Sequence, residues 1–196
     1  MFIKYYDGNI VDSTAPIIAH QVNFEGIMGA GVAKSIKEKY PDIMKDYQEF
    51  CKNNYGHLGS IHFYKRGEDD KRNPLYIANC FSQKSNSEDG CLTDYDSFSF
   101  CMLQLRDGMI RNNIEHRIAM PYKIGCGIGG ADWEEIWWRI EYSFGEEFAR
   151  DFVVELWNIN KYTEKERKEL PIECYYKRPP NTPYNIPRST EINSPF

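Results

Sequence analysis

Two glycine-rich segments of the sequence have the composition of loops that hold phosphate groups. Asn23-Phe-Glu-Gly-Ile-Met-Gly-Ala-Gly31 follows the apolar run 16–22, and Ile124-Gly-Cys-Gly-Ile-Gly-Gly130 follows the run 117–121. A helical pattern follows each segment, so each predicts a strand, a glycine loop and a helix N-terminus. Glycine lets the backbone approach a ligand, and free N–H groups of the loop and first helical turn can donate to an anion. Two such loops predict a diphosphate site, whereas the alternative for either loop is a tight turn without a ligand.

Two polar residues, His20 and Asn23, lead into the first loop. A histidine can take or give a proton near neutral pH, which suits a hydrolytic reaction. Side chains three residues apart on a strand point to opposite faces, but Asn23 falls just beyond the expected strand, so both can reach one cleft. The alternative for His20 is a buried histidine with a purely structural hydrogen bond, and the sequence leaves both readings open.

Familiar nucleotide motifs fit these loops less well. Gly26 and Gly31 have the interval of a P-loop, but the lysine that should follow directly is displaced to Lys34. Gly125, Gly127 and Gly130 satisfy the GxGxxG pattern. A dinucleotide-binding unit also needs an acidic residue about 20 positions later, and too little chain follows to complete one. A nucleotide oxidoreductase or other nucleotide-binding protein is therefore the weaker alternative.

The pattern around the loops predicts an α/β layered fold, because short β-branched and aromatic runs alternate with helical stripes. We expect strands at 2–6, 17–22, 60–64, 75–78, 117–121 and 152–156. Apolar residues at helical spacing predict helices over 32–40, 43–51, 95–109 and 136–148, the last one capped by Asp132. These stripes are most simply core-facing, so we give them no functional role.

Composition limits the class of protein. The 196 residues suffice for one domain, and the net charge of −5 without a long Lys/Arg run argues against duplex nucleic acid as a partner. Six cysteines include no CxxC pair and no zinc spacing, so we expect reduced thiols, no metal and a cytoplasmic location. The sequence has neither a signal-peptide pattern nor an apolar run long enough to span a membrane.

The C-terminal part of the sequence differs from the rest. Residues 171–196 hold six of the ten prolines, which excludes a regular helix or a central strand there. We therefore expect one domain over residues 1–160 and an irregular, proline-rich extension over 161–196. The extension can lie over the domain as a strap or serve as a contact arm.

Four motifs in this order resemble the macro domain family: Gly8-Asn-Ile10, Ala19-His-Gln-Val-Asn23, Met28-Gly-Ala-Gly-Val-Ala33 and Ile124-Gly-Cys-Gly127. The resemblance covers about residues 1–157 and is closest to the compact branch of ADP-ribose 1″-phosphate phosphatases and related phage and bacterial proteins. It implies a three-layer α/β/α sandwich with a mixed, mostly parallel sheet, and a cleft for ADP-ribose over the strand ends.

The resemblance also implies roles for single residues. Asn9 stands where the family often has an aspartate for the adenine amino group, and Asn23 stands where an asparagine contacts the distal ribose. Catalysis falls to His20 and Asn23, without a metal or cofactor. The implied ligand-binding residues are Asn9, Ile10, Asn23, Gly29, Ala30, Gly31, Val32, Gly125, Cys126, Gly127, Ile128 and Gly129.

The function implied is binding of ADP-ribose, ADP-ribose 1″-phosphate or ADP-ribosylated macromolecules, with hydrolysis of a bond at the distal ribose. A phosphatase and a de-ADP-ribosylating hydrolase both fit, and a non-catalytic reader of ADP-ribose is the alternative. The family member that cleaves glutamyl–ADP-ribose uses a lysine and an aspartate. Here the aspartate position is Gly129 and no lysine occurs at 80–82, with Lys84 the nearest, so a covalent lysine mechanism is not expected.

Overall fold

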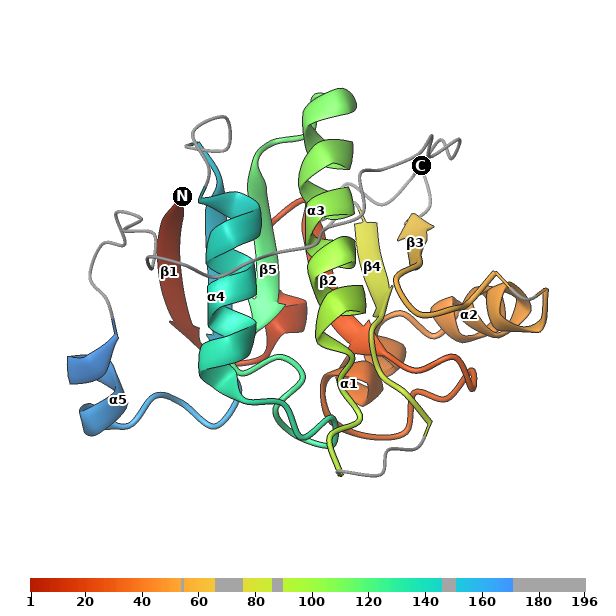
Figure 1. Cartoon of the computed structure of the whole chain (residues 1–196), viewed down its shortest axis with the longest axis horizontal. Coiled ribbons are helices and arrows are strands. Elements are labelled where there is room, and N and C mark those ends of the chain that lie inside the picture. Colours follow the sequence, from red (N-terminus) through yellow and green to blue (C-terminus); the bar gives the residue numbers. More distant parts are fainter. Residues whose placement is uncertain (54, 66–75, 86–89, 146–150, 171–196) are drawn as a thin grey trace.

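The computed structural model describes residues 1–53, 55–65, 76–85, 90–145 and 151–170. Its centre is a six-stranded sheet in the order β1-β6-β5-β2-β4-β3 (Figure 1). All neighbouring strands are parallel except β3, which runs antiparallel to β4. The strands are β1 (Phe2–Asp7), β2 (Ile17–Val22), β3 (Ile61–Lys65), β4 (Tyr76–Phe81), β5 (Arg117–Pro121) and β6 (Val153–Asn158).

Helices cover both faces of this sheet, with α3 and α4 side by side in front of it and α1 behind it in Figure 1. The helices are the short 3-10 helix η1 (Ile10–Asp12), α1 (Gly31–Lys39), α2 (Ile43–Lys52), α3 (Tyr95–Arg111), α4 (Trp133–Phe144) and α5 (Glu164–Glu169). Among these helices, none is long and apolar enough to cross a membrane.

Alternation along strand β2 explains the three layers. Ile17 and Ala19 lie in the core beneath α3 and α4, whereas Ile18 and Val22 lie in the core beneath α1 and α2. All four side chains are buried, as expected for a central strand covered on both faces. Each large aliphatic side chain buried in this way contributes about 1.5–3 kcal/mol. The expected α/β/α sandwich with a mixed, mostly parallel sheet is therefore confirmed.

The pairing of β2 with β5 is short and leaves their carboxyl ends apart. Strand β2 pairs with β4 along its whole length, but it pairs with β5 only at Ile17 and Ile18. The chain leaves β2 toward α1 on one face of the sheet and leaves β5 toward α4 on the other. Such a point, where neighbouring strands lead to opposite faces, is where open α/β sheets bind ligands.

The segment 161–170 corrects the expected boundary at residue 160. It is not irregular, because α5 occupies Glu164–Glu169 and begins with a capping box between Thr163 and Glu166. Tyr162 is 5% exposed, and its hydroxyl donates to the carbonyl of Leu156 at 3.0 Å. Residues up to 170 therefore pack as part of the domain, while the proline-rich residues 171–196 lie outside the described residues.

Candidate functional site

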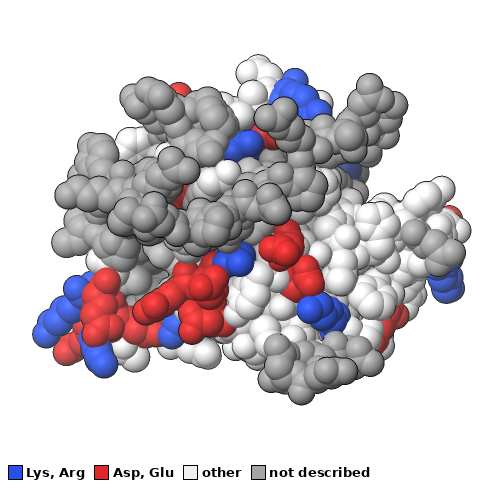
Figure 2. Space-filling model, viewed as in Figure 1, with Lys and Arg blue, Asp and Glu red and all other residues white. Residues whose placement is uncertain are grey.

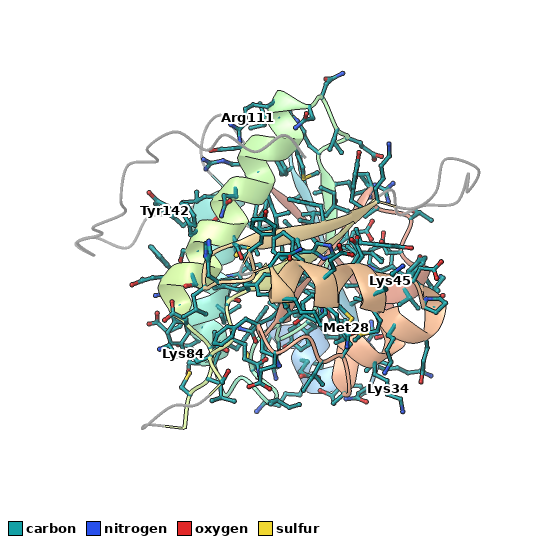
Figure 3. The ribbon with its side chains drawn as sticks, turned by 90° about the vertical axis from the view of Figure 1, so that its right-hand side faces the viewer. Met28, Lys34, Lys45, Lys84, Arg111 and Tyr142 are labelled. Carbon is teal, nitrogen blue, oxygen red and sulfur yellow. The ribbon has the colours of Figure 1, made fainter. Side chains whose placement is uncertain are left out.

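The two glycine loops lie at one edge of the sheet, because β2 and β5 are parallel neighbours and each loop follows the carboxyl end of its strand. The segment after β4 reaches the same edge. There the N–H of Gln83 donates to the carbonyl of Val22 at 3.3 Å, which continues the strand pairing beyond β4. In Figure 3, Lys34 on α1 and Lys84 lie toward this end, and Arg111 lies toward the opposite end.

The second glycine loop leaves consecutive backbone amides without a partner. Four backbone hydrogen bonds form turns within the loop. The one that spans the most residues runs from the N–H of Ala131 to the carbonyl of Gly125 at 3.0 Å. The N–H groups of Gly127, Ile128 and Gly129 donate to no other described residue. Gly127 and Ile128 are exposed, and a methyl group added at Gly127 would meet nothing within 4 Å. Adjacent free amides of this kind form an anion-binding concavity.

The first glycine loop ends at a helix that carries no acidic cap. Residue Ala30 occupies the N-cap position of α1 in an extended conformation, and no side chain caps the helix. Its first turn has no acidic residue, so the N–H groups of Gly31 and Val32 and the positive end of the helix dipole are available to an anion. Gly29, Ala30 and Gly31 are exposed, and Val32 is half-buried.

The helix after the second loop begins with Asp132 as its cap, as the sequence predicts, and this cap occupies the helix N-terminus. The carboxylate of Asp132 caps α4 by accepting from the N–H groups of Glu134 and Glu135 at 2.8 and 3.2 Å. These two glutamates add negative charge to the same turn. An anion at this loop must therefore use the loop amides, because the N-terminus of α4 is already occupied by its own carboxylates.

Asn23 is held in a defined position at the end of β2. Its side-chain oxygen accepts from the N–H of Glu25 at 2.9 Å, and its backbone carbonyl accepts from the hydroxyl of Tyr47 on α2. Burial raises the pKa of Tyr47, so this hydroxyl stays protonated and remains a donor. The side-chain amide nitrogen of Asn23 has no partner among the described residues, which leaves its two N–H groups for a ligand.

His20 does not reach this edge as an exposed proton carrier. Its side chain is 1% exposed and lies on the face covered by α1 and α2, where its Nε2 bonds to Asn79 on β4. Burial lowers the pKa of His20 to about 4, so the ring is neutral at neutral pH. The structure thus favours the structural reading of His20 over the catalytic one, because a group closed off from solvent by helix α2 cannot exchange protons with a substrate over the loops.

The other residues expected to bind the ligand differ in how far they are buried. Asn9 is half-buried, and its side-chain oxygen accepts from the N–H of Val11 at 3.3 Å, which leaves one lone pair for adenine. Ile10 is 3% exposed and packs in the core beneath α1, so its side chain is not a ligand contact. Gly129 is also buried, because the loop passes directly over Thr93 there. Cys126 is half-buried, and burial raises the pKa of its thiol to about 11.

Three positioning residues, Gln21, Thr93 and Tyr47, were not identified from the sequence. Gln21 donates to Thr93 Oγ1 at 3.1 Å, and Thr93 in turn donates to Gly125 at 3.0 Å. The available signal for Gln21 was its polarity in a mostly apolar strand, at a position that shares a strand face with Asn23 two residues later. Thr93 and Tyr47 gave no local signal, since their partners are distant in sequence.

The charges around the site are balanced by close partners. Lys84 lies 3.2 Å from the carboxylate of Asp94, which also caps α3. Lys123, next to the second loop, lies 3.4 Å from Glu166 on α5. On the face drawn in Figure 2, acidic side chains gather at the lower left, and the basic ones among the described residues form no continuous patch. A phosphate here must be bound by backbone amides rather than by a cluster of cations.

Comparisons with known proteins agree with this architecture. The family model for the macro domain matches residues 19–137. An ADP-ribose 1″-phosphate phosphatase of Lodderomyces elongisporus is 30% identical over 141 residues, which cover 68% of this chain and 88% of that protein. A DNA ADP-ribosyl glycohydrolase of Thermus aquaticus is 28% identical over 141 residues, which cover 71% of this chain and 37% of that protein.

A solved structure supports the same assignment. The macrodomain of Thermus aquaticus DarG superposes with a TM-score of 0.64 at 25% identity, covering 81% of this chain and 98% of that one. The sheet order, the paired glycine loops and the family match over residues 19–137 lead to one conclusion. The chain belongs to the macro domain family.

Proposed function

We propose that this protein binds ADP-ribose or a close derivative at the edge formed by loops 23–32 and 124–130 and hydrolyses a bond at the distal ribose. The observation that carries the proposal is the pair of exposed, free amides at Gly127 and Ile128, which lies at the same sheet edge as the uncapped N-terminus of α1. The similarity to an ADP-ribose 1″-phosphate phosphatase and a DNA ADP-ribosyl glycohydrolase supports the ligand class.

The polar groups at this edge suggest how the ligand is oriented. The diphosphate accepts from the amides of the second loop and of the first turn of α1. The distal ribose lies near Asn23, whose free side-chain N–H groups donate to a ribose hydroxyl, and the adenine lies toward Asn9, which retains one acceptor lone pair. In this pose the diphosphate is fixed at the centre, and the reacting end is aligned by Asn23.

We assign orientation rather than proton transfer to Asn23, because a carboxamide does not titrate. His20 is buried and bonded to Asn79, so we assign it a structural role within the sheet. Lys84 is held by an ion pair with Asp94 at 3.2 Å, so its side chain is not positioned as a nucleophile. A covalent lysine–ribose intermediate is therefore not part of the proposal, and borohydride should trap no adduct.

The test is phosphate release from ADP-ribose 1″-phosphate, run beside release of ADP-ribose from ADP-ribosylated protein and DNA. We expect turnover with at least one of these substrates, and the Asn23→Ala variant should lower both turnover and affinity. Asn112→Ala is the matched control, since Asn112 lies at the opposite end of α3 and bonds only within that helix. If the wild type binds ADP-ribose but turns over none of the substrates, the reader function replaces the hydrolase.

The same proposal includes a cytoplasmic location. Cys51, Cys80, Cys91, Cys101 and Cys126 are free thiols in the described part of the chain. Free thiols suit a reducing compartment, where ADP-ribose and ADP-ribosylated macromolecules are the partners we expect. Fractionation of the native cells, followed by immunoblotting, tests this location directly.

A further inference from the structure

Thr93 holds both ends of the segment that carries the free amides. This residue precedes α3 and is 2% exposed. Its backbone N–H donates to the carbonyl of Gly129 at 2.9 Å, and its hydroxyl donates to the carbonyl of Gly125 at 3.0 Å. The path of the loop between these two carbonyls, and thus the direction of the amides at Gly127 and Ile128, depends on this one residue.

The hydroxyl of Thr93 is itself oriented by strand β2. The side-chain nitrogen of Gln21 donates to Thr93 Oγ1 at 3.1 Å and to the carbonyl of Ser82 at 3.0 Å. The hydroxyl has a single proton, and Gly125 O at 3.0 Å is a closer acceptor than Gln21 Oε1 at 3.4 Å. The side chain of Gln21 therefore donates to the Thr93 hydroxyl, and that hydroxyl donates to the carbonyl of Gly125. These two hydrogen bonds connect the loop through Thr93 to the central strand β2.

The backbone of the second glycine loop also packs closely against Thr93. A methyl group added at Gly129 would lie 2.4 Å from Thr93 Oγ1, and one added at Gly125 would lie 3.2 Å from it. The loop backbone thus rests directly on the hydroxyl, with no side chain between them. Gly125 has a φ of +81°, a conformation that glycine adopts without strain and that turns the loop over Thr93.

We propose that Thr93 is a positioning residue for ligand binding, which fixes the second glycine loop so that its amides converge on the diphosphate. Thr93 itself is buried and touches no ligand. The proposal rests on the proposed function for the identity of the ligand, but the connection from Gln21 through Thr93 to Gly125 is a property of the fold alone. Thr93 lies outside both glycine loops and, in this proposal, contributes to the affinity for ADP-ribose.

The test compares Thr93→Val, which keeps the shape and removes the hydroxyl, with Thr93→Ser, which keeps the hydroxyl. Thr14→Val is the matched control, because the hydroxyl of Thr14 accepts from Arg117 at 2.9 Å at the other end of β2. Calorimetry with ADP-ribose should show affinity about five- to tenfold weaker for Thr93→Val, the factor of one neutral hydrogen bond. Thr93→Ser and Thr14→Val should bind within about twofold of the wild type, since each retains the Thr93 hydroxyl bond.

Hydrogen exchange of the amides of residues 125–131 supplies a readout that does not need the ligand. It should be faster in Thr93→Val than in the wild type and unchanged in Thr14→Val. If Thr93→Val does not fold, the smaller Thr93→Ala takes its place in both measurements. A folded Thr93→Val with the affinity and exchange of the wild type overturns the role of Thr93, as does a Thr93→Ser that binds as weakly as Thr93→Val. A wild type that binds no ADP-ribose overturns instead the proposed function and the ligand assigned to the loop.

Discussion

Nε2 of His20 on strand β2 lies 2.5 Å from Oδ1 of Asn79 on the neighbouring strand β4. The row continues across the sheet, because Asn79 Nδ2 lies 2.8 Å from His62 Nδ1, and His62 Nε2 lies 3.2 Å from the carboxylate of Asp46 on α2. Each ring is neutral when Asn79 accepts from one histidine and donates to the other. The row thus pairs buried polar side chains beneath α2 and ties four elements together, namely β2, β4, β3 and α2.

We predict that His20→Ala lowers stability and leaves the site intact. The substitution removes the partner of Asn79 Oδ1 in a fully buried position, and an orphaned buried acceptor costs about 1–3 kcal/mol. Urea unfolding should show this loss, while calorimetry should give the ADP-ribose affinity of the wild type. A variant with unchanged stability and turnover slowed about a hundredfold would instead restore His20 to a catalytic role.

The free energy of unfolding should decrease as the pH is lowered through the range in which these histidines take up protons in the unfolded chain. Burial lowers the pKa of His20 to about 4 and also lowers that of His62, so the folded protein holds both rings neutral. The unfolded chain takes up protons below about pH 6.5, and the stabilisation is therefore present above that pH and lost as the pH falls toward 4. Each ring contributes at most about 1.4 kcal/mol per pH unit.

The matched variant for this pH dependence is His20→Gln, which keeps a donor for Asn79 but does not titrate. Urea unfolding at several pH values between 7 and 4 should give a shallower slope for His20→Gln than for the wild type. Lowered carboxyl pKa values, such as that of Asp7 with its hydrogen bond from the backbone of Tyr162, act at lower pH and equally in both proteins. Parallel curves for the two proteins would rule out His20 as a source of the pH dependence.

Much of the sheet was predictable because its central strands are short apolar runs with clear limits. The strands Ile17–Val22 and Arg117–Pro121 were predicted with the observed bounds. In each case a proline marks one end, before Ile17 and at Pro121, and a glycine loop follows. Strand β4 was expected at 75–78 but continues to Phe81. The polar Asn79 hides this continuation in the sequence, because its side-chain amide is buried and bonded to two histidines.

The candidate site was predictable only where glycine and asparagine mark the chain. The positions of the two loops and of Asn23 followed from local sequence. The role of His20 did not, since alternation on a strand does not reveal which helix covers which face. The segment 161–170 was expected to be irregular, yet Thr163 and Glu166 have the spacing of a capping box that predicts a helix start. Long-range partners such as Thr93 and Gly125 are visible only once the chain is folded.

Gly129 and Gly127 should respond differently to alanine, although they lie two residues apart in one loop. A methyl group at Gly129 would lie 2.4 Å from Gly125 O and from Thr93 Oγ1, whereas one at Gly127 meets nothing within 4 Å. We expect Gly129→Ala to lose about 1–3 kcal/mol of stability through overpacking and to weaken ligand binding. Gly127→Ala should unfold like the wild type. Equal unfolding midpoints for the two variants would contradict the described packing of Gly129.

Truncation should separate the folded part of the C-terminal segment from the rest. A chain ending at Leu170 keeps Tyr162, whose ring centroid lies 4.7 Å from that of Tyr122 and 5.7 Å from that of Tyr5. A chain ending at Lys161 loses this buried ring, at a cost of about 3–5 kcal/mol. Thermal unfolding should therefore give the midpoint of the full chain for the first truncation and a clearly lower one for the second. Equal midpoints would place the domain boundary at 160 after all.

The central claim is that the second glycine loop holds the diphosphate of ADP-ribose, and Gly127→Glu tests it most directly. The added side chain has room, so the variant should fold like the wild type, and Gly127→Gln controls for its size. Two like charges about 4 Å apart near a protein surface repel by about 4 kcal/mol, enough to weaken binding at least about a hundredfold. Calorimetric titration with ADP-ribose should show saturable binding to the wild type and Gly127→Gln, and none to Gly127→Glu. Wild-type affinity in a folded Gly127→Glu, or no binding to the wild type, would contradict the claim.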